Sequence, residues 1–158
     1  AGGDEALDRL DEAMEVYGRV FDENCTYKVV PYKGIERMLE TLKKQGIRLA
    51  VLSNKPDRQV GHVIKEIFGE GIFYWIQGQK GVPRKPDPSA ALDIADRLGT
   101  EIAETAYIGD SEVDLATGKA AGMKTILVSW GFRGRKALEE DGADCIVDSV
   151  DEILEIMR

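Results

Sequence analysis

The sequence is poor in the residues that mark several classes of protein. Its two cysteines, Cys25 and Cys145, stand far apart and lack CxxC spacing, so we interpret both as reduced thiols of a cytoplasmic protein. No apolar run approaches the length that spans a bilayer, and no signal peptide is visible. These absences predict a chain without a membrane partner.

Positive charge is scarce as well. The 158 residues carry 21 Lys and Arg against 29 Asp and Glu, which gives a net charge of −8, and no basic cluster occurs. We therefore expect no nucleic-acid partner. The single histidine, His62, is interpreted as a surface or boundary residue of a helix and not as a base. The oligomeric state stays open.

Apolar runs of strand length alternate with helical patterns along the chain, and Asp57 is expected to cap the helix after the first run. That first run is almost continuously apolar, which predicts a strand covered on both faces. The alternation predicts an α/β fold with a doubly wound parallel sheet. The expected strands are Ile47–Leu52, Ile72–Ile76, Ala106–Ile108, Lys124–Val128 and Cys145–Val147.

A helix with a wide apolar face is predicted over Asp4–Asn24. A face of this width needs partners on more than one side. Its apolar positions at helical spacing are Leu7, Leu10, Met14, Tyr17 and Phe21.

The segment Ala106–Gly122 predicts a strand, a tight turn and a helix. Asp110 then stands at the carboxyl end of a strand, where open α/β sheets bind ligands, and Asp114 lies one helical turn deeper. Two carboxylates beside Ser111 and a helix N-terminus suit Mg²⁺. In the alternative interpretation, Asp110 is an N-cap and Asp114 a solvated acid. The apolar side of the helix is expected to hold Val113, Ala116, Ala120 and Ala121.

Polar residues of complementary kinds follow three successive strands. Ser53-Asn54 offers a hydroxyl and backbone amides, Lys85 offers a compact positive charge, and Asp110 with Asp114 offers carboxylates. Taken singly, Ser53-Asn54 is best interpreted as an ordinary turn and Lys85 as a solvated loop lysine. In this order, at these element ends, the three favour phosphoryl chemistry.

The sequences of these motifs resemble those of the haloacid dehalogenase superfamily, and within it those of the phosphoglycolate phosphatase branch. Ser53-Asn54-Lys55-Pro56, Lys85-Pro86-Asp87-Pro88 and Gly109–Asp114 look like its second, third and fourth motifs. Pro31–Gly34 and Trp130–Arg133 also match that branch. The resemblance covers essentially the whole chain and implies a Rossmann-like core with the remnant of a helical cap.

The resemblance also implies roles for individual residues. Ser53 and the Asn54 amide would bind the substrate phosphoryl group, and Lys85 would bind the same group and the nucleophile. Asp110 would be a ligand of Mg²⁺, with Asp114 as an auxiliary acid beside it. By the same resemblance, residues 1–27 would be the last cap helix and its connector, and residues 28–158 the core.

One family motif has no counterpart here. The resemblance implies a first strand ending in Asp-X-Asp, whose first aspartate becomes an aspartyl-phosphate and whose second is the general acid and base. No Asp-X-Asp occurs in the 158 residues. We therefore expect a longer natural chain, with an open position between Ile47–Leu52 and Ala106–Ile108 and unpaired ladder groups on both sides of it.

These features predict a Mg²⁺-dependent phosphatase for a small phosphorylated metabolite, 2-phosphoglycolate by resemblance, with the 158 residues inactive by themselves. Alternatives within the family are another phosphatase, a phosphomutase or a pyrophosphatase. An alternative from a different functional class is a non-catalytic phosphate-binding or regulatory protein. A receiver-type phosphoacceptor domain, with Asp110 as the acceptor, is a further hypothesis. The order Ser53, Lys85, Asp110 argues against it, because the acceptor aspartate of a receiver precedes its hydroxyl and its lysine.

Overall fold

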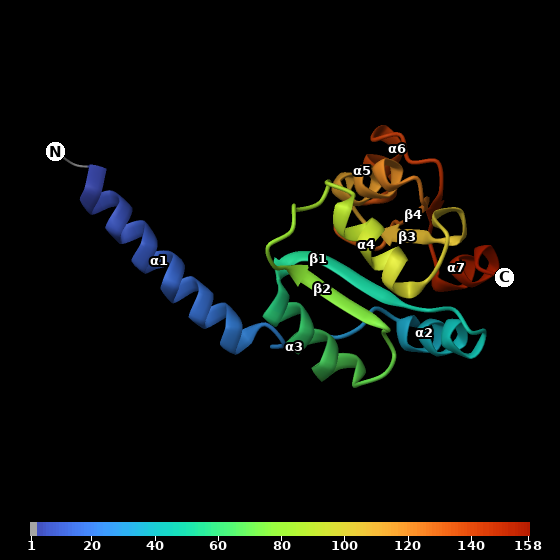
Figure 1. Cartoon of the computed structure of the whole chain (residues 1–158), viewed down its shortest axis with the longest axis horizontal. Helices are drawn as coiled ribbons and strands as arrows, with labels where there is room; N and C mark the ends of the chain where they lie inside the picture. The colour runs from blue at the N-terminus through green and yellow to red at the C-terminus, as the bar shows by residue number, and fades with distance from the viewer. Residues whose placement is uncertain (1–2) are drawn as a thin grey trace.

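The computed structural model describes residues 3–158, with helices wrapped around short parallel strands (Figure 1). Lys124–Val128 is a strand as predicted, and the other expected strands are present with shifted ends. In chain order the elements are α1 (Gly3–Asn24), α2 (Ile35–Lys44), β1 (Ala50–Pro56), α3 (Asp57–Phe68), β2 (Trp75–Gln79), α4 (Ser89–Leu98), a 3₁₀ turn (Ile102–Glu104), β3 (Ala106–Gly109), α5 (Glu112–Ala121), β4 (Lys124–Val128), α6 (Arg135–Glu140), β5 (Ile146–Val147) and α7 (Val150–Ile156).

Two parallel sheets form the centre of the fold. Strands β1 and β2 pair with Leu52 opposite Gln77, and strands β3, β4 and β5 pair in that order, with Gly109 opposite Leu127. The α/β class with parallel strands and covering helices is confirmed. Among residues 3–158 no ladder joins β1 to β3, which is where the sequence predicts an open position in the doubly wound sheet.

The first two strands begin three residues later than expected. The apolar residues that precede them, among them Ile47, Leu49, Ile72 and Phe73, pack against the core below α2 and α7 instead of joining the ladder. Figure 1 shows α2 and α7 beside each other at this end of the molecule. Their buried residues, with β4 and β5, form the largest core cluster: Met38, Leu39, Leu42, Ile126, Val147, Val150, Ile153 and Leu154.

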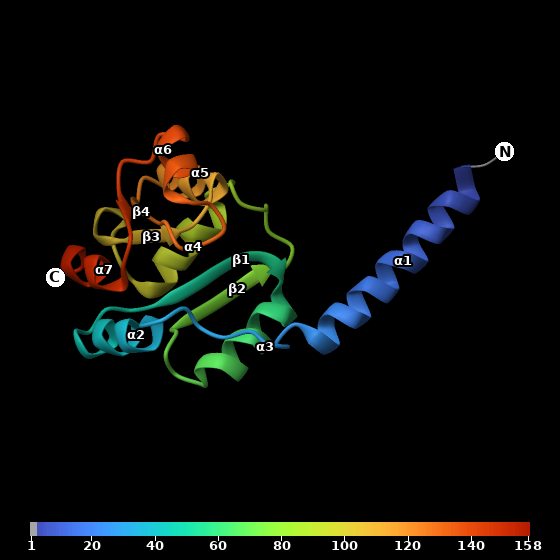
Figure 2. The ribbon, with the colours of Figure 1, turned by 180° about the vertical axis from the view of Figure 1, so that it is seen from behind.

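Helix α1 extends away from the rest of the molecule in both views (Figures 1 and 2). Its described apolar side chains are largely exposed: Leu10 at 55%, Tyr17 at 62% and Val20 at 50%. The predicted helix is confirmed, and these side chains have little packing against the described body of the chain. The side chains of Leu7, Met14 and Phe21 lie outside the described part.

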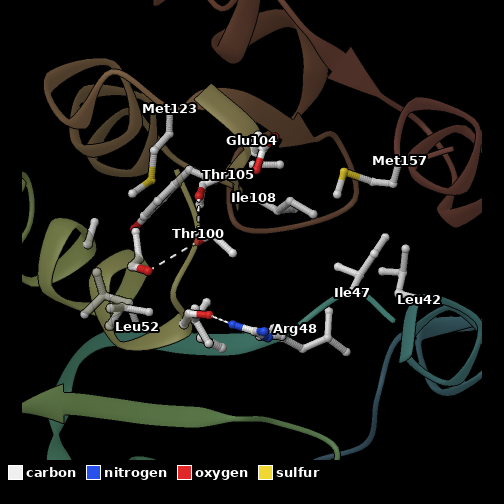
Figure 3. A pocket seen from close by; sticks show the side chains of 18 of the residues that line it. Leu42, Ile47, Arg48, Leu52, Thr100, Glu104, Thr105, Ile108, Met123 and Met157 are labelled. Atoms are coloured by element: carbon white, nitrogen blue, oxygen red, sulfur yellow. Dashed lines mark hydrogen bonds between the residues drawn. The ribbon is translucent and has the colours of Figure 1, made fainter. Parts of the chain in front are cut away.

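A cavity of about 590 Å³ separates β1 from β3 (Figure 3). Strand residues on both sides line it, with residues of α4 between them and Met157 near its far end. Strand β1 contacts α3 and α4 but is only half-buried, because one edge pairs with β2 and the other faces this cavity. The lining residues on the two strands are Ala50, Val51, Leu52, Ala106, Tyr107 and Ile108.

Two local expectations are corrected by hydrogen bonding and packing. Asp57 is the first residue of α3 and not its cap, because its carboxylate accepts from the Gly78 N–H at 2.9 Å and ties α3 to β2. Helix α5 is rotated from the predicted orientation. It buries Asp114, Leu115, Thr117, Gly118 and Ala121, while Ala116 and Ala120 face solvent.

Candidate functional site

Polar side chains from three segments meet where β1, β2 and β3 end. The Asn54 side chain accepts from the Lys85 N–H at 2.9 Å and donates to the Lys85 carbonyl at 3.1 Å. The Lys85 ammonium donates to Asp114 at 2.7 Å, and the Asp110 N–H donates to the same carboxylate at 3.2 Å. A continuous series of contacts therefore runs from Asn54 through Lys85 and Asp114 to Asp110.

The Lys85–Asp114 ion pair lies at the centre of this series. Both side chains are largely buried, with 14% and 9% of their surface exposed. Burial pushes the pKa of Asp114 upward, but hydrogen bonds from Lys85 and Ser111 and the charge of Lys85 outweigh it and lower that pKa. Asp114 is therefore ionised at neutral pH. Within the described residues, the Lys85 ammonium makes no second hydrogen bond, so two of its three donors remain for a ligand.

Asp114 is the most fully bonded acid of the site. Its Oδ2 accepts from the Ser111 hydroxyl at 2.6 Å, and its Oδ1 accepts a longer bond from the Tyr107 hydroxyl at 3.4 Å. Burial and the charge of Asp114 raise the pKa of Tyr107, which stays a neutral donor. Both Asp114 oxygens are therefore engaged within the protein, and the role of Asp114 as an auxiliary acid beside Asp110 stays a prediction.

Ser111 is the N-cap of α5, and its hydroxyl accepts from the Asp114 N–H at 3.4 Å. The interpretation of Asp110 as the cap is therefore wrong. Gly109 is required for the close approach of strand and helix, because a Cβ there would lie 2.2 Å from the Asp114 Cβ. The glycine before Asp110 thus lets the buried acid reach back under the turn.

Asp110 lies at the carboxyl end of β3, as predicted. Its Oδ2 accepts from the Phe132 N–H at 2.8 Å, and its carbonyl accepts from the Arg133 N–H at 3.1 Å. Its Oδ1 has no hydrogen-bond partner among the described residues. One carboxylate oxygen is therefore held by the loop after β4 while the other stays available.

Sequence reasoning missed two features of this site: the Tyr107 hydroxyl, and the ion pair of Glu112 with Arg133, which is described below. A tyrosine two residues before Gly109 on the same strand face was the available signal for the first. Ser53 lies beside Asn54, and its hydroxyl accepts from the Lys55 N–H at 3.2 Å, as in an ordinary turn.

The donor set fits Mg²⁺ in part. Mg²⁺ is commonly held by one or two carboxylates and completes its shell with water and substrate oxygens. Asp110 offers one such oxygen, and in residues 3–158 no cluster of three or more His, Cys, Asp or Glu side chains is arranged as a metal site. Asp110 is thus the single carboxylate of this group that could hold the cation.

None of the helices described in residues 3–158 is long and apolar enough to cross a lipid bilayer.

The chain is similar to curated and solved proteins over nearly all of its length. It is 28% identical over 155 residues to a phosphoglycolate phosphatase of Pseudomonas syringae pv. syringae, covering 98% of this chain and 56% of that protein. It is 30% identical over 151 residues to a phosphoglycolate phosphatase of Pseudomonas fluorescens, covering 95% and 54%. The chain therefore spans about half the length of these curated relatives.

Solved structures agree in fold. A crystal structure of a presumed phosphoglycolate phosphatase from Lactobacillus delbrueckii subsp. bulgaricus superimposes with a TM-score of 0.89 at 34% identity, covering 95% of this chain and 63% of that one. A predicted phosphoglycolate phosphatase from Haemophilus somnus gives 0.82 at 26% identity, covering 90% and 64%. The family model for haloacid dehalogenase-like hydrolases matches residues 4–128. The chain belongs to the haloacid dehalogenase-like hydrolases.

Proposed function

We propose that this chain is the larger part of a Mg²⁺-dependent phosphatase for a small phosphorylated metabolite, with 2-phosphoglycolate as the first substrate to test. The reaction class is phosphoryl transfer to an aspartate followed by hydrolysis of the aspartyl-phosphate. Support for the substrate comes from the names of the similar proteins. Two free cysteines in the described chain support a reducing, cytoplasmic location.

The observation that carries the proposal is the series of contacts from Asn54 through Lys85 and Asp114 to Asp110. Phosphoryl transfer needs preorganised donors and positive charge where negative charge develops. A lysine held by a buried carboxylate, with donors left over, supplies both. Lys85 lies near Asp110, whose carboxylate has one free oxygen. This arrangement suits a phosphoryl group bound by the Lys85 ammonium and by a cation held at Asp110.

Each residue has a proposed task. The Ser53 hydroxyl and the Asn54 backbone N–H bind phosphoryl oxygens, while the Asn54 side chain holds the Lys85 backbone in place. Lys85 neutralises charge on the phosphoryl group, and Asp114 orients the ammonium. Asp110 would hold Mg²⁺, which supplies Lewis-acid stabilisation of the phosphoryl oxygens when bound.

The nucleophile is proposed to lie outside the 158 residues. No Asp-X-Asp occurs in the sequence, Asp110 is assigned to the metal, and Asp114 is engaged by Lys85. The cavity between β1 and β3 is lined by residues of both strands, Ala50–Leu52 on one side and Ala106–Ile108 on the other. A further parallel strand seated there would place an aspartate at its carboxyl end beside Lys85 and Asp110.

The test measures phosphate release from 2-phosphoglycolate, sugar phosphates and pyrophosphate. We expect no turnover by residues 1–158 and Mg²⁺-dependent turnover by a longer polypeptide that adds an Asp-X-Asp strand. In that polypeptide Asp110→Asn should abolish turnover, and Lys85→Ala should lower kcat more than it changes KM. The control is Asp93→Asn, an exposed acid of α4 paired with Arg97.

Two outcomes would contradict the proposal. Robust Mg²⁺-dependent release by residues 1–158 would mean that the nucleophile is misidentified. Full activity of Asp110→Asn would remove the metal assignment. The second candidate function, a non-catalytic phosphate-binding protein, is favoured by the lack of Asp-X-Asp alone, and it predicts phosphate binding without turnover by the longer polypeptide as well.

A further inference from the structure

The loop after β4 folds over the turn that carries Asp110. A Cβ on Gly131 would lie 2.3 Å from the Asp110 Cβ, so the two segments are in direct contact. Two successive N–H groups of the loop donate to Asp110, that of Phe132 to Oδ2 and that of Arg133 to the backbone carbonyl. The orientation of the Asp110 carboxylate therefore depends on where this loop lies.

An ion pair fastens the loop to the first turn of α5. The Arg133 Nε donates to Glu112 Oε2 at 2.9 Å, and its Nη2 donates to Oε1 at 2.8 Å, which is a bidentate contact. Glu112 is the first residue of α5, two positions after Asp110. The helix that begins beside Asp110 and the loop that covers it are thus joined by two parallel hydrogen bonds.

We propose that Glu112 and Arg133 are positioning residues that hold the Phe132 N–H on Asp110 and so direct the other carboxylate oxygen toward the cation. The part of this inference that concerns the cation rests on the proposed function. Neither residue touches the phosphoryl group in this assignment. Arg133 uses the Nε–Nη2 edge of its guanidinium for Glu112.

Exposure separates this role from simple stabilisation. The two side chains are 42% and 44% exposed, and exposed ion pairs add little to the free energy of unfolding. A bidentate pair, however, fixes geometry because both partners must keep one relative orientation.

The chain contains a matched control two residues further on. Arg135 makes an equivalent pair with Asp148, through Nε at 3.0 Å and Nη2 at 2.8 Å, with exposures of 41% and 58%. This second pair ties α6 to the end of β5 and has no contact with Asp110. Asp148 also accepts from the Ser129 hydroxyl at the start of this loop, and Asp148→Asn keeps an amide oxygen that can still accept that bond while the ion pair is lost.

The experiment compares Glu112→Gln and Arg133→Lys with Asp148→Asn in the longer polypeptide that adds the Asp-X-Asp strand. Amide hydrogen exchange of Phe132 is read by NMR. We expect protection in the wild type and in Asp148→Asn, and a loss of about tenfold in Glu112→Gln. Arg133→Lys, which keeps the charge but not the fork, should lose protection as well. An unprotected Phe132 amide in the wild type, or equal protection in all four proteins, would overturn the proposal.

Binding of Mn²⁺ alone, followed by paramagnetic broadening of the Ser111 amide, tests the link to the cation. The apparent Kd should rise about tenfold in Glu112→Gln and stay unchanged in Asp148→Asn. Equal Kd values in wild type and Glu112→Gln would overturn the positioning role. No broadening in any protein would instead refute the metal role of Asp110, while the Phe132 protection would still decide whether the ion pair holds the loop.

Discussion

The ammonium nitrogen of Lys85 lies 2.7 Å from Oδ1 of Asp114, and this buried pair joins the loop after β2 to the helix after β3. The contact connects the two sheets, which no ladder joins within residues 3–158, at the carboxyl ends of their strands. It therefore has two consequences that are measured separately, one for the free energy of unfolding and one for how that free energy changes with pH.

Removing one partner of this pair should destabilise the chain. Asp114→Asn leaves the Lys85 ammonium buried without a counter-charge, and we expect the free energy of unfolding to fall by about 3 kcal/mol. Urea unfolding measures the change. The exposed pair of Lys44 with Glu40 is the control, and Glu40→Gln should change stability by less than about 0.5 kcal/mol. Equal effects of the two variants would show that the buried pair is solvated in solution.

The same pair predicts a pH dependence. The pKa of Asp114 is lower in the folded chain than its unfolded value of 3.8, so its stabilising contribution is complete above about pH 3.8 and is lost as the pH falls further. The difference in unfolding free energy between wild type and Asp114→Asn should be constant from pH 7 to pH 5 and shrink below about pH 4. Urea titrations at several pH values test this. A difference that shrank between pH 7 and pH 5 would contradict it.

Asn54 should matter through its side chain. Its amide satisfies both backbone groups of Lys85, so Asn54→Ala leaves one N–H and one carbonyl of a part-buried loop without partners. We expect a loss of about 2 kcal/mol and faster exchange of the Lys85 amide. Asn24→Ala is the control, because the Asn24 amide donates to the Val20 carbonyl at an exposed position. Unchanged exchange at Lys85 would mean that the loop is held by other contacts.

Much of this fold is predictable from sequence because helix signals are local. The ends of α2, α4 and α5 follow from the glycines or polar residues that terminate them, and α7 follows from its Ser149–Glu152 capping box. The beginnings of β1 and β2 were missed because Ile47 and Ile72 are apolar for packing against the core and not for strand pairing. An apolar run by itself does not separate these two causes.

The candidate site is predictable in its residue types but not in its bonding. Asn54 lies near the end of β1, Lys85 follows β2 and Asp110 follows β3, and these positions bring them together because parallel strands end at the same edge. Asp114 pairs with Lys85, and the Phe132 N–H donates to Asp110. Both contacts join segments that are distant in the sequence. A sequence pattern contains no signal for such contacts.

Close packing of α5 on β4 predicts opposite effects for two helical glycines. A Cβ on Gly118 would lie 2.3 Å from the Thr125 Oγ1, whereas a Cβ on Gly61 in α3 meets nothing within 4 Å. Gly118→Ala should therefore cost about 1–3 kcal/mol through overpacking, while Gly61→Ala should stabilise by about 0.5–1 kcal/mol because alanine favours the helix. Thermal unfolding measures both. The double variant Gly118→Ala with Thr125→Ala should recover most of the loss, and no recovery would place the clash elsewhere.

The cavity between β1 and β3 makes the last prediction. Its walls are mostly apolar side chains, with Arg48 and Glu104 among the polar ones, and unpaired strand edges, so a peptide that adds both apolar surface and ladder hydrogen bonds should bind there. We expect a synthetic apolar strand of about six residues, ending in Asp-X-Asp, to raise the Tm in a concentration-dependent way.

The same peptide with a central proline is the first control, because proline removes a ladder donor and should abolish the shift. Ile108→Arg, which places a charge on the cavity wall at a position 40% exposed, is the second control and should weaken binding while leaving the fold intact. A Tm shift that survives both changes would mean that the peptide binds elsewhere, for example on the exposed face of α1. If the peptide raises the Tm of neither the wild type nor any variant, the two sheets close on each other in solution. The open position for the nucleophile strand would then not exist.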